Sequence, residues 1–101
     1  MFKVELVFSK QDRMRYLSHL DLMRLFTRAI RRAGLPVKMT EGFNPHPKFS
    51  MSRALKLGVE SASEKATLIF REKMCAGEIK ARLNGQLPKG IEVKDVQGYF
   101  N

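Results

Sequence analysis

Residues 18–36, SHLDLMRLFTRAIRRAGLP, decide how the rest of the chain can be arranged, because they form its longest stretch with a single clear periodicity. Their apolar residues recur at the i, i+3, i+4 and i+7 spacing of an amphipathic helix. Ser18 stands three residues before Asp21, so its hydroxyl can cap a helix whose first turn carries a negative charge. A glycine and a proline at the other end supply the stop. The pattern predicts a helix over residues 19–33.

Outward from this helix, alternating apolar residues predict strands. Residues 2–8, FKVELVF, place every second side chain on one buried face. Weaker alternation predicts strands at 37–40, 66–70 and 91–96 and marks a candidate for a further short strand at 48–52. Ile79, Leu83 and Leu87 predict a second helix over 76–86. The order β-α-β-β-α-β predicts an α+β fold of the ferredoxin-like, split βαβ type. Two helices then cover one face of a four-stranded antiparallel sheet, and the other face needs a cover or a ligand.

Composition limits the chain to one domain. The 101 residues are 44% hydrophobic and 29% charged, which is typical of one folded core without room for a second. No apolar run reaches the roughly 20 residues that span a bilayer, and no signal peptide is visible, so we expect a cytoplasmic protein without a membrane partner. Cys75 has no second cysteine to pair with. His19, Asp21, His46 and Cys75 lack a metal-ligand spacing, so we expect no metal and no cofactor in this chain.

Positive charge is concentrated in the first part of the chain. Residues 1–58 hold 12 Lys and Arg against 4 Asp and Glu, a net +8, out of a total of +9. Such a field attracts polyanions and indicates RNA or another phosphate-rich partner. Arg24, Arg28, Arg31 and Arg32 fall at i, i+4, i+7 and i+8 on the predicted helix, without acidic partners at i+4. Guanidinium groups suit phosphate, although a solvated helix face is the alternative.

Further basic and aromatic residues flank the helix. Lys10, Arg13, Arg15, Lys38, Lys48, Arg53 and Lys56 are interleaved with Tyr16, Phe43 and Phe49. Cations and rings together are what single-stranded RNA binds, through phosphates and unpaired bases. Phe49 fits the core by its alternation, whereas Phe43 beside a loop glycine is a candidate for stacking. The residues predicted to contact nucleic acid are Arg15, Arg24, Arg28, Arg31, Arg32, Phe43, His46, Lys48 and Arg53.

Two histidines leave a catalytic alternative open. His19 at the start of the helix could act as a general base towards a ribose hydroxyl, or it could simply pack beside the cap. His46, between two prolines, is expected to face outward and touch a ligand. In the ribonuclease alternative one of these histidines is the base, and Lys48 or Arg15 stabilises the developing charge. Asp21 is expected to serve the cap.

Several segments carry a resemblance to a known family. They are residues 14–24 (MRYLSHLDLMR), 31–36 (RRAGLP), 41–48 (EGFNPHPK) and 57–61 (LGVES), with further agreement at 83–84, 87–88 and 90–91. Together they resemble the radical-SAM-linked domain of unknown function over nearly the whole chain. The resemblance implies a bacterial cytoplasmic domain, alone or fused behind a radical SAM enzyme module, often encoded near ribosomal or RNA-processing genes. Family members usually continue further, so the chain corresponds to their N-terminal part, and they often carry Arg where this chain has His46.

Three functions follow as expectations. The first is a non-catalytic RNA-binding accessory domain that presents RNA to a radical SAM enzyme. The second is a metal-independent ribonuclease, to which a looser, fold-level similarity with the ferredoxin-like endoribonucleases of CRISPR transcripts also points. The third is a protein-docking module that receives a radical SAM module through its open sheet face or chain end. The sequence does not indicate an oligomeric state.

Overall fold

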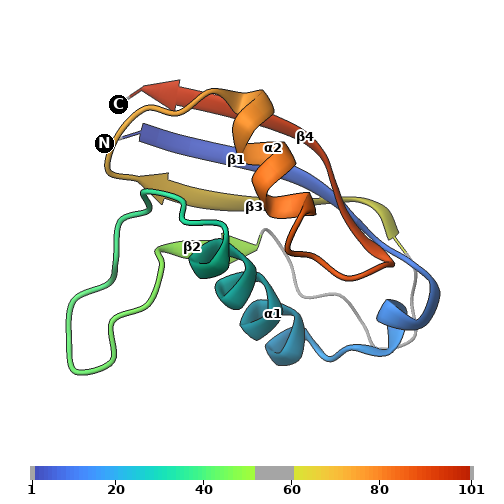
Figure 1. The fold of residues 1–101 in the computed structure, drawn as a ribbon. Coiled ribbons are helices and arrows are strands. Elements are labelled where there is room, and N and C mark those ends of the chain that lie inside the picture. Colours follow the sequence, from blue (N-terminus) through green and yellow to red (C-terminus); the bar gives the residue numbers. More distant parts are fainter. Residues whose placement is uncertain (1, 52–60, 101) are drawn as a thin grey trace.

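The computed structural model describes residues 2–51 and 61–100. The elements, shown in Figure 1, are β1 (Phe2–Lys10), the short 3₁₀ helix η1 (Asp12–Tyr16), α1 (His19–Arg32), β2 (Phe49–Met51), β3 (Ser61–Phe70), α2 (Ala76–Asn84) and β4 (Ile91–Phe100). Their order matches the predicted β-α-β-β-α-β pattern, with η1 as an addition. Neither helix in the described part of the chain has the length and apolar character that crossing a bilayer requires.

The four strands form one antiparallel sheet in the order β2-β3-β1-β4. Both helices pack on the same face of this sheet (Figure 1). The arrangement is consistent with the predicted ferredoxin-like fold. Leu6 lies at the centre, opposite Ala66 of β3 and Val96 of β4. β4 extends beyond the predicted residues 91–96 because it pairs with the whole length of β1.

The core lies between the sheet and the helices. Every second residue of β1 is buried, from Phe2 to Phe8, as the alternation predicts. Phe26 of α1 packs against two strands at once, with its ring 4.8 Å from that of Phe8 and 5.4 Å from that of Phe49. Phe49 is thereby part of the core side of β2, as expected. These contacts fix which face of α1 remains exposed.

The ends of α1 follow from local chemistry. The Ser18 hydroxyl accepts a hydrogen bond from the Asp21 backbone N–H at 3.1 Å, which confirms the predicted cap. Gly34 follows the helix with a φ of 66°, a conformation that a residue with a Cβ adopts only with strain. Arg82 of α2 donates to the carbonyl oxygen of Ala33 at 3.4 Å and pairs with Glu78 at 2.7 Å. A side chain distant in the sequence therefore supports the end of α1.

The predicted strand over residues 37–40 is wrong. Two isolated bridges replace it, because Val37 pairs with Phe70 of β3 whereas Met39 pairs with Pro47. The partner changes within two residues, and proline has no N–H with which to continue a ladder. The result is a hairpin, closed by hydrogen bonds from Lys48 N to Lys38 O and from Thr40 N to His46 O, each 2.8 Å. We call residues 38–48 the loop hairpin.

Lys10 was predicted to belong to the basic surface around α1, but it does not. It ends β1 and is fully buried, and its Nζ donates to the carbonyl oxygen of Leu17 at 2.6 Å. Burial lowers the pKa of Lys10, because the charged ammonium is removed from water. The side chain holds the turn between β1 and α1 and is unavailable to a ligand.

Candidate nucleic-acid interface

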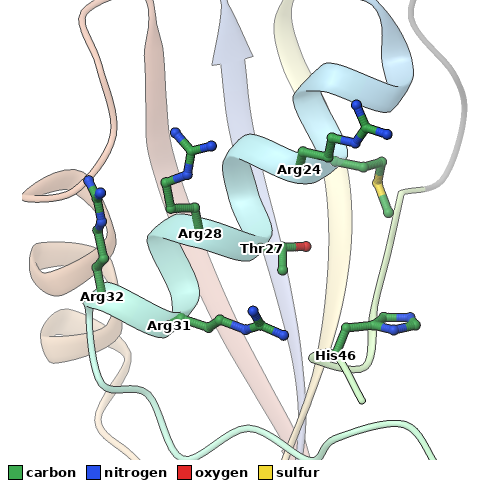
Figure 2. Close-up of a pocket in the computed structure, with 7 residues that line it drawn as sticks. Arg24, Thr27, Arg28, Arg31, Arg32 and His46 are labelled. Atoms are coloured by element: carbon green, nitrogen blue, oxygen red, sulfur yellow. The ribbon is translucent and has the colours of Figure 1, made fainter. Parts of the chain in front are cut away.

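A groove of about 570 Å³ runs along the exposed side of α1 (Figure 2). Its lining residues are Met23, Arg24, Thr27, Arg28, Arg31, Arg32 and His46. The four arginines predicted from helical spacing therefore share one surface feature with a predicted ligand-contacting histidine. We call this feature the arginine groove.

The amphipathic geometry of α1 produces the arginine groove. Leu22, Phe26 and Ile30 repeat every four residues and are buried. The arginines at positions 24, 28 and 32 repeat with the same period two residues later, so they form a ridge on the outer side. Arg31 is offset from that ridge, and Figure 2 shows its side chain extending toward His46, whereas Arg28 and Arg32 extend away from it.

The four guanidinium groups differ in what contacts them. Arg24 lies 3.9 Å from the Asp21 carboxylate, and both side chains are more than half exposed, so this ion pair is weak. Arg31 donates to the carbonyl oxygen of Pro45 at 3.1 Å. Within residues 2–51 and 61–100, no hydrogen-bond or ion-pair partner contacts the guanidinium of Arg28 or Arg32. These two retain their donors for a ligand.

The loop hairpin holds the imidazole of His46 in place. Its Nδ1 lies 3.1 Å from the carbonyl oxygen of Asn44 and 3.2 Å from the hydroxyl of Thr40. The His46 backbone N–H also donates to the Thr40 hydroxyl at 3.1 Å. Pro47 next to it is buried, which anchors this side of the hairpin. Nδ1 is thus engaged by the hairpin, and Nε2 is the ring nitrogen left for a ligand.

A second groove of about 330 Å³ lies on the other side of the arginine ridge. It is lined by Leu25, Arg28, Ala29, Arg32 and residues 85–88, which follow α2. Arg28 and Arg32 line both grooves, so their guanidinium groups can be approached from two sides. The sequence did not indicate this groove, because it depends on where the end of α2 packs.

The other predicted contact residues lie outside the arginine groove. Phe43 is fully exposed on the loop hairpin, after Gly42, whose φ is 120°. Lys48 is exposed at the base of the same hairpin. The Arg15 guanidinium lies over the Tyr16 ring at 4.8 Å from its centroid, and it donates to the Tyr16 hydroxyl at 2.7 Å. Arg53 falls outside the described residues.

The residues of the catalytic alternative differ in their surroundings. His46 lines the arginine groove, whereas His19 and Lys48 do not. The Nδ1 atom of His19 is buried and has no hydrogen-bond partner among the described residues. His19 directly follows the capping residue Ser18 at the start of α1. Across the described ranges, no three His, Cys, Asp or Glu side chains gather in a geometry for metal.

Two lining residues were not predicted as contacts. Met23 is one of the apolar residues of the helix, but it is only half-buried and lines the groove next to Arg24. Thr27 lies three residues after Arg24 and four before Arg31, which places it between them on the helix surface. A helical projection centred on the arginines could have found Thr27.

Comparisons with known proteins place the chain in a family without assigning it a ligand. A search of curated proteins found no match. A family model described as "Uncharacterized protein conserved in bacteria (DUF2344)" matches residues 3–101. That description names no partner enzyme. Because the match covers nearly the whole sequence, the chain belongs to this bacterial DUF2344 family.

Proposed function

We propose that this chain is a non-catalytic RNA-binding domain that presents RNA to a partner enzyme. The observation that carries the proposal is the arginine groove, in which Arg28 and Arg32 have no carboxylate within ion-pair distance in the described ranges. Four cations aligned on one helix repel one another unless an anion lies between them. An external polyanion would supply that counter-charge.

The shape of the guanidinium group favours phosphate as the anion. Arginine presents a planar fork of donors that matches two phosphate oxygens at once. The arginine ridge runs from residue 24 to 32, which at 1.5 Å per residue is about 12 Å of helix. This length spans more than one phosphate of an extended strand, so a chain of phosphates fits better than a single small anion.

Phe43 favours a single strand over a duplex. Its fully exposed ring stands on the same hairpin that brings His46 to the arginine groove. An exposed aromatic ring on a segment that borders a cationic groove is an arrangement on which unpaired bases can stack. Phosphates held on α1 and a base on Phe43 together describe single-stranded RNA.

The partner enzyme is proposed from the family resemblance. The sequence resembles domains found alone or behind a radical SAM module, so we propose that the partner is an enzyme of this class. In this proposal the domain binds RNA and the partner enzyme carries out the reaction. RNA incubated with the protein should therefore remain intact on a denaturing gel.

The groove is tested by charge reversal. A fluorescent single-stranded RNA of about 12 nucleotides, within the range that small single-strand-binding domains cover, is titrated and followed by anisotropy. The double variant Arg28→Glu/Arg32→Glu should weaken binding by about a hundredfold or more, since each of the two charge-assisted contacts contributes about 1.5–3 kcal/mol.

The matched control reverses two charges elsewhere. Lys65 lies in β3 opposite Val7, on the strand surface that faces away from the core, and Lys80 is exposed on α2. The variant Lys65→Glu/Lys80→Glu changes the net charge equally and should lower affinity less than about threefold. Equal losses in the two variants would reduce the interaction to general attraction and contradict the proposal.

A further inference from the structure

The position of the proton on His46 can be read from its contacts. Nδ1 lies 3.1 Å from the carbonyl oxygen of Asn44, an atom that only accepts hydrogen bonds. Nδ1 must therefore carry the hydrogen. The Thr40 hydroxyl, 3.2 Å away, already accepts from the His46 backbone N–H and can accept from Nδ1 as well. In the neutral ring, Nε2 is then an acceptor.

Few side chains of the arginine groove can accept a hydrogen bond. The four guanidinium groups of the arginine groove can only donate. Among the lining side chains, the strong acceptors are Nε2 of His46 and the hydroxyl of Thr27. Phosphate oxygens accept and do not donate, so they pair with the arginines and leave neutral Nε2 unsatisfied. The group that completes the site must offer a hydrogen.

A ligand bound to Arg31 can bring a hydrogen-bond donor to His46. One of the five donors of Arg31 is engaged by the carbonyl of Pro45, the residue before His46, and the other donors are left for a phosphate. In an RNA strand the ribose 2′-hydroxyl lies close to the following phosphate. A phosphate on Arg31 thus sets a 2′-hydroxyl beside His46.

We infer that His46 is the residue by which the arginine groove distinguishes RNA from DNA, its Nε2 accepting a hydrogen bond from a ribose 2′-hydroxyl. This inference rests on the proposed binding of single-stranded nucleic acid. The arginines supply affinity that does not depend on the sugar, and His46 supplies the preference for ribose.

Three oligonucleotides of one sequence test the inference: RNA, DNA and 2′-O-methyl RNA. The methyl ether keeps the sugar pucker of RNA but removes the donor hydrogen. Affinities are measured at about pH 8, where imidazole is mostly neutral. The wild type should bind RNA roughly threefold to tenfold more tightly than either analogue, which is the contribution of one neutral hydrogen bond.

Two substitutions of His46 separate the effect of its hydrogen-bond acceptor from the effect of positive charge. His46→Asn retains an amide where Nδ1 lies and removes the acceptor, so the three oligonucleotides should bind alike. His46→Arg offers donors only, and it should bind all three more tightly while also losing the preference. Asn44→Ala keeps the backbone carbonyl and serves as the control for changes in the loop hairpin, with the preference retained. Thermal unfolding checks that every variant is folded.

The outcomes distinguish the inference from the proposed function. A preference for RNA that persists in His46→Asn and His46→Arg overturns the role of His46, as does equal binding of RNA and 2′-O-methyl RNA. In both cases Arg28→Glu/Arg32→Glu still weakens all three oligonucleotides, so the groove itself stands. If the wild type shows no arginine-dependent binding to any of them, the proposed function fails and the inference fails with it.

Discussion

At the scale of single residues, the surroundings of each arginine decide how much of it a ligand can use. The Asp21 carboxylate, 3.9 Å away, partly offsets the positive charge of Arg24. Arg31 donates one of its hydrogen bonds to the Pro45 carbonyl. Arg28 and Arg32 have neither constraint among the described residues, and each borders two grooves. We expect these two to contribute most to affinity, and Arg31 to contribute most to the position of the strand.

Removal of the Phe43 ring separates stacking from charge. Phe43→Ala should weaken single-stranded RNA binding by about tenfold, because a base stacked on an aromatic ring contributes about 1–3 kcal/mol. Duplex RNA, whose bases are already stacked, should bind with unchanged affinity. Anisotropy titrations with both probes make the comparison. A parallel loss for duplex and single strand would mean that the substitution disturbs the loop hairpin rather than a stacking surface.

Lys10 predicts a particular dependence of stability on pH. Because burial holds the pKa of Lys10 below 10.5, the unfolded chain binds more protons than the folded chain between the folded pKa and 10.5. Stability from this site is fully present above 10.5 and is lost as the pH falls through the folded pKa. The wild type should therefore gain stability relative to Lys10→Met as the pH rises toward 10.5.

Urea unfolding followed by circular dichroism measures this difference at about pH 7 and about pH 10. The comparison variant Lys80→Met removes an exposed lysine of α2, and its difference from the wild type should change little over the same range. A constant difference between wild type and Lys10→Met would show that the ammonium is hydrated in solution.

At the scale of elements, the arginine groove depends on two segments, α1 and the loop hairpin. α1 is held on the sheet by the Phe26 cluster. The loop hairpin is held by the hydrogen bonds of Lys38 and Lys48 with Ile69 of β3 and by the bond from Arg31 to Pro45. The helix is therefore the rigid part of the site. The hairpin positions His46 and Phe43 relative to it.

Asn84 connects the end of α2 to β4. Its amide nitrogen donates to the Val93 carbonyl oxygen at 3.1 Å, and its amide oxygen accepts from the Val93 N–H at 2.8 Å. Asn84→Ala leaves both groups of a buried strand residue unsatisfied, so the free energy of unfolding should fall by about 2 kcal/mol or more. Chemical denaturation checks the value, with Lys80→Ala as the exposed control on the same helix. A loss of stability no larger than that of the control would contradict the role of the two hydrogen bonds between Asn84 and Val93.

At the scale of the whole molecule, charge is distributed unequally along the chain. Residues 1–58 carry a net +8, and the described part of this half includes α1 and the loop hairpin. The positive field therefore surrounds the proposed site and should speed the encounter with RNA. The second half contributes β3, α2 and β4, which complete the core.

The dependence of affinity on salt tests how many phosphates are neutralised. If the four arginines each displace one counterion from a single strand, the logarithm of affinity should fall with the logarithm of salt with a slope of about −3. Arg28→Ala/Arg32→Ala should reduce the slope to about −1.5. Titrations between about 50 and 200 mM salt measure both. An unchanged slope in the variant would place the phosphates elsewhere on the protein.

Much of the site could be predicted from periodicity, because a helix repeats every 3.6 residues whatever surrounds it. That regularity aligned Arg24, Arg28 and Arg32 opposite the buried stripe. The strand at 37–40 was not predicted correctly, since a short alternation does not reveal that Val37 and Met39 pair with different partners. The burial of Lys10 was also missed, because a charged residue at a strand end carries no local sign of the carbonyl it will reach.

The sequence by itself determined the order of the elements, the buried side of each and the cap at Ser18, since all of these follow from spacing within one segment. Only the tertiary structure decided that His46 meets the arginines. That meeting depends on the hairpin folding back until the Pro45 carbonyl accepts a bond from Arg31, 14 residues away. Contacts through space between separate segments are set by packing of the whole core, and local periodicity does not encode them.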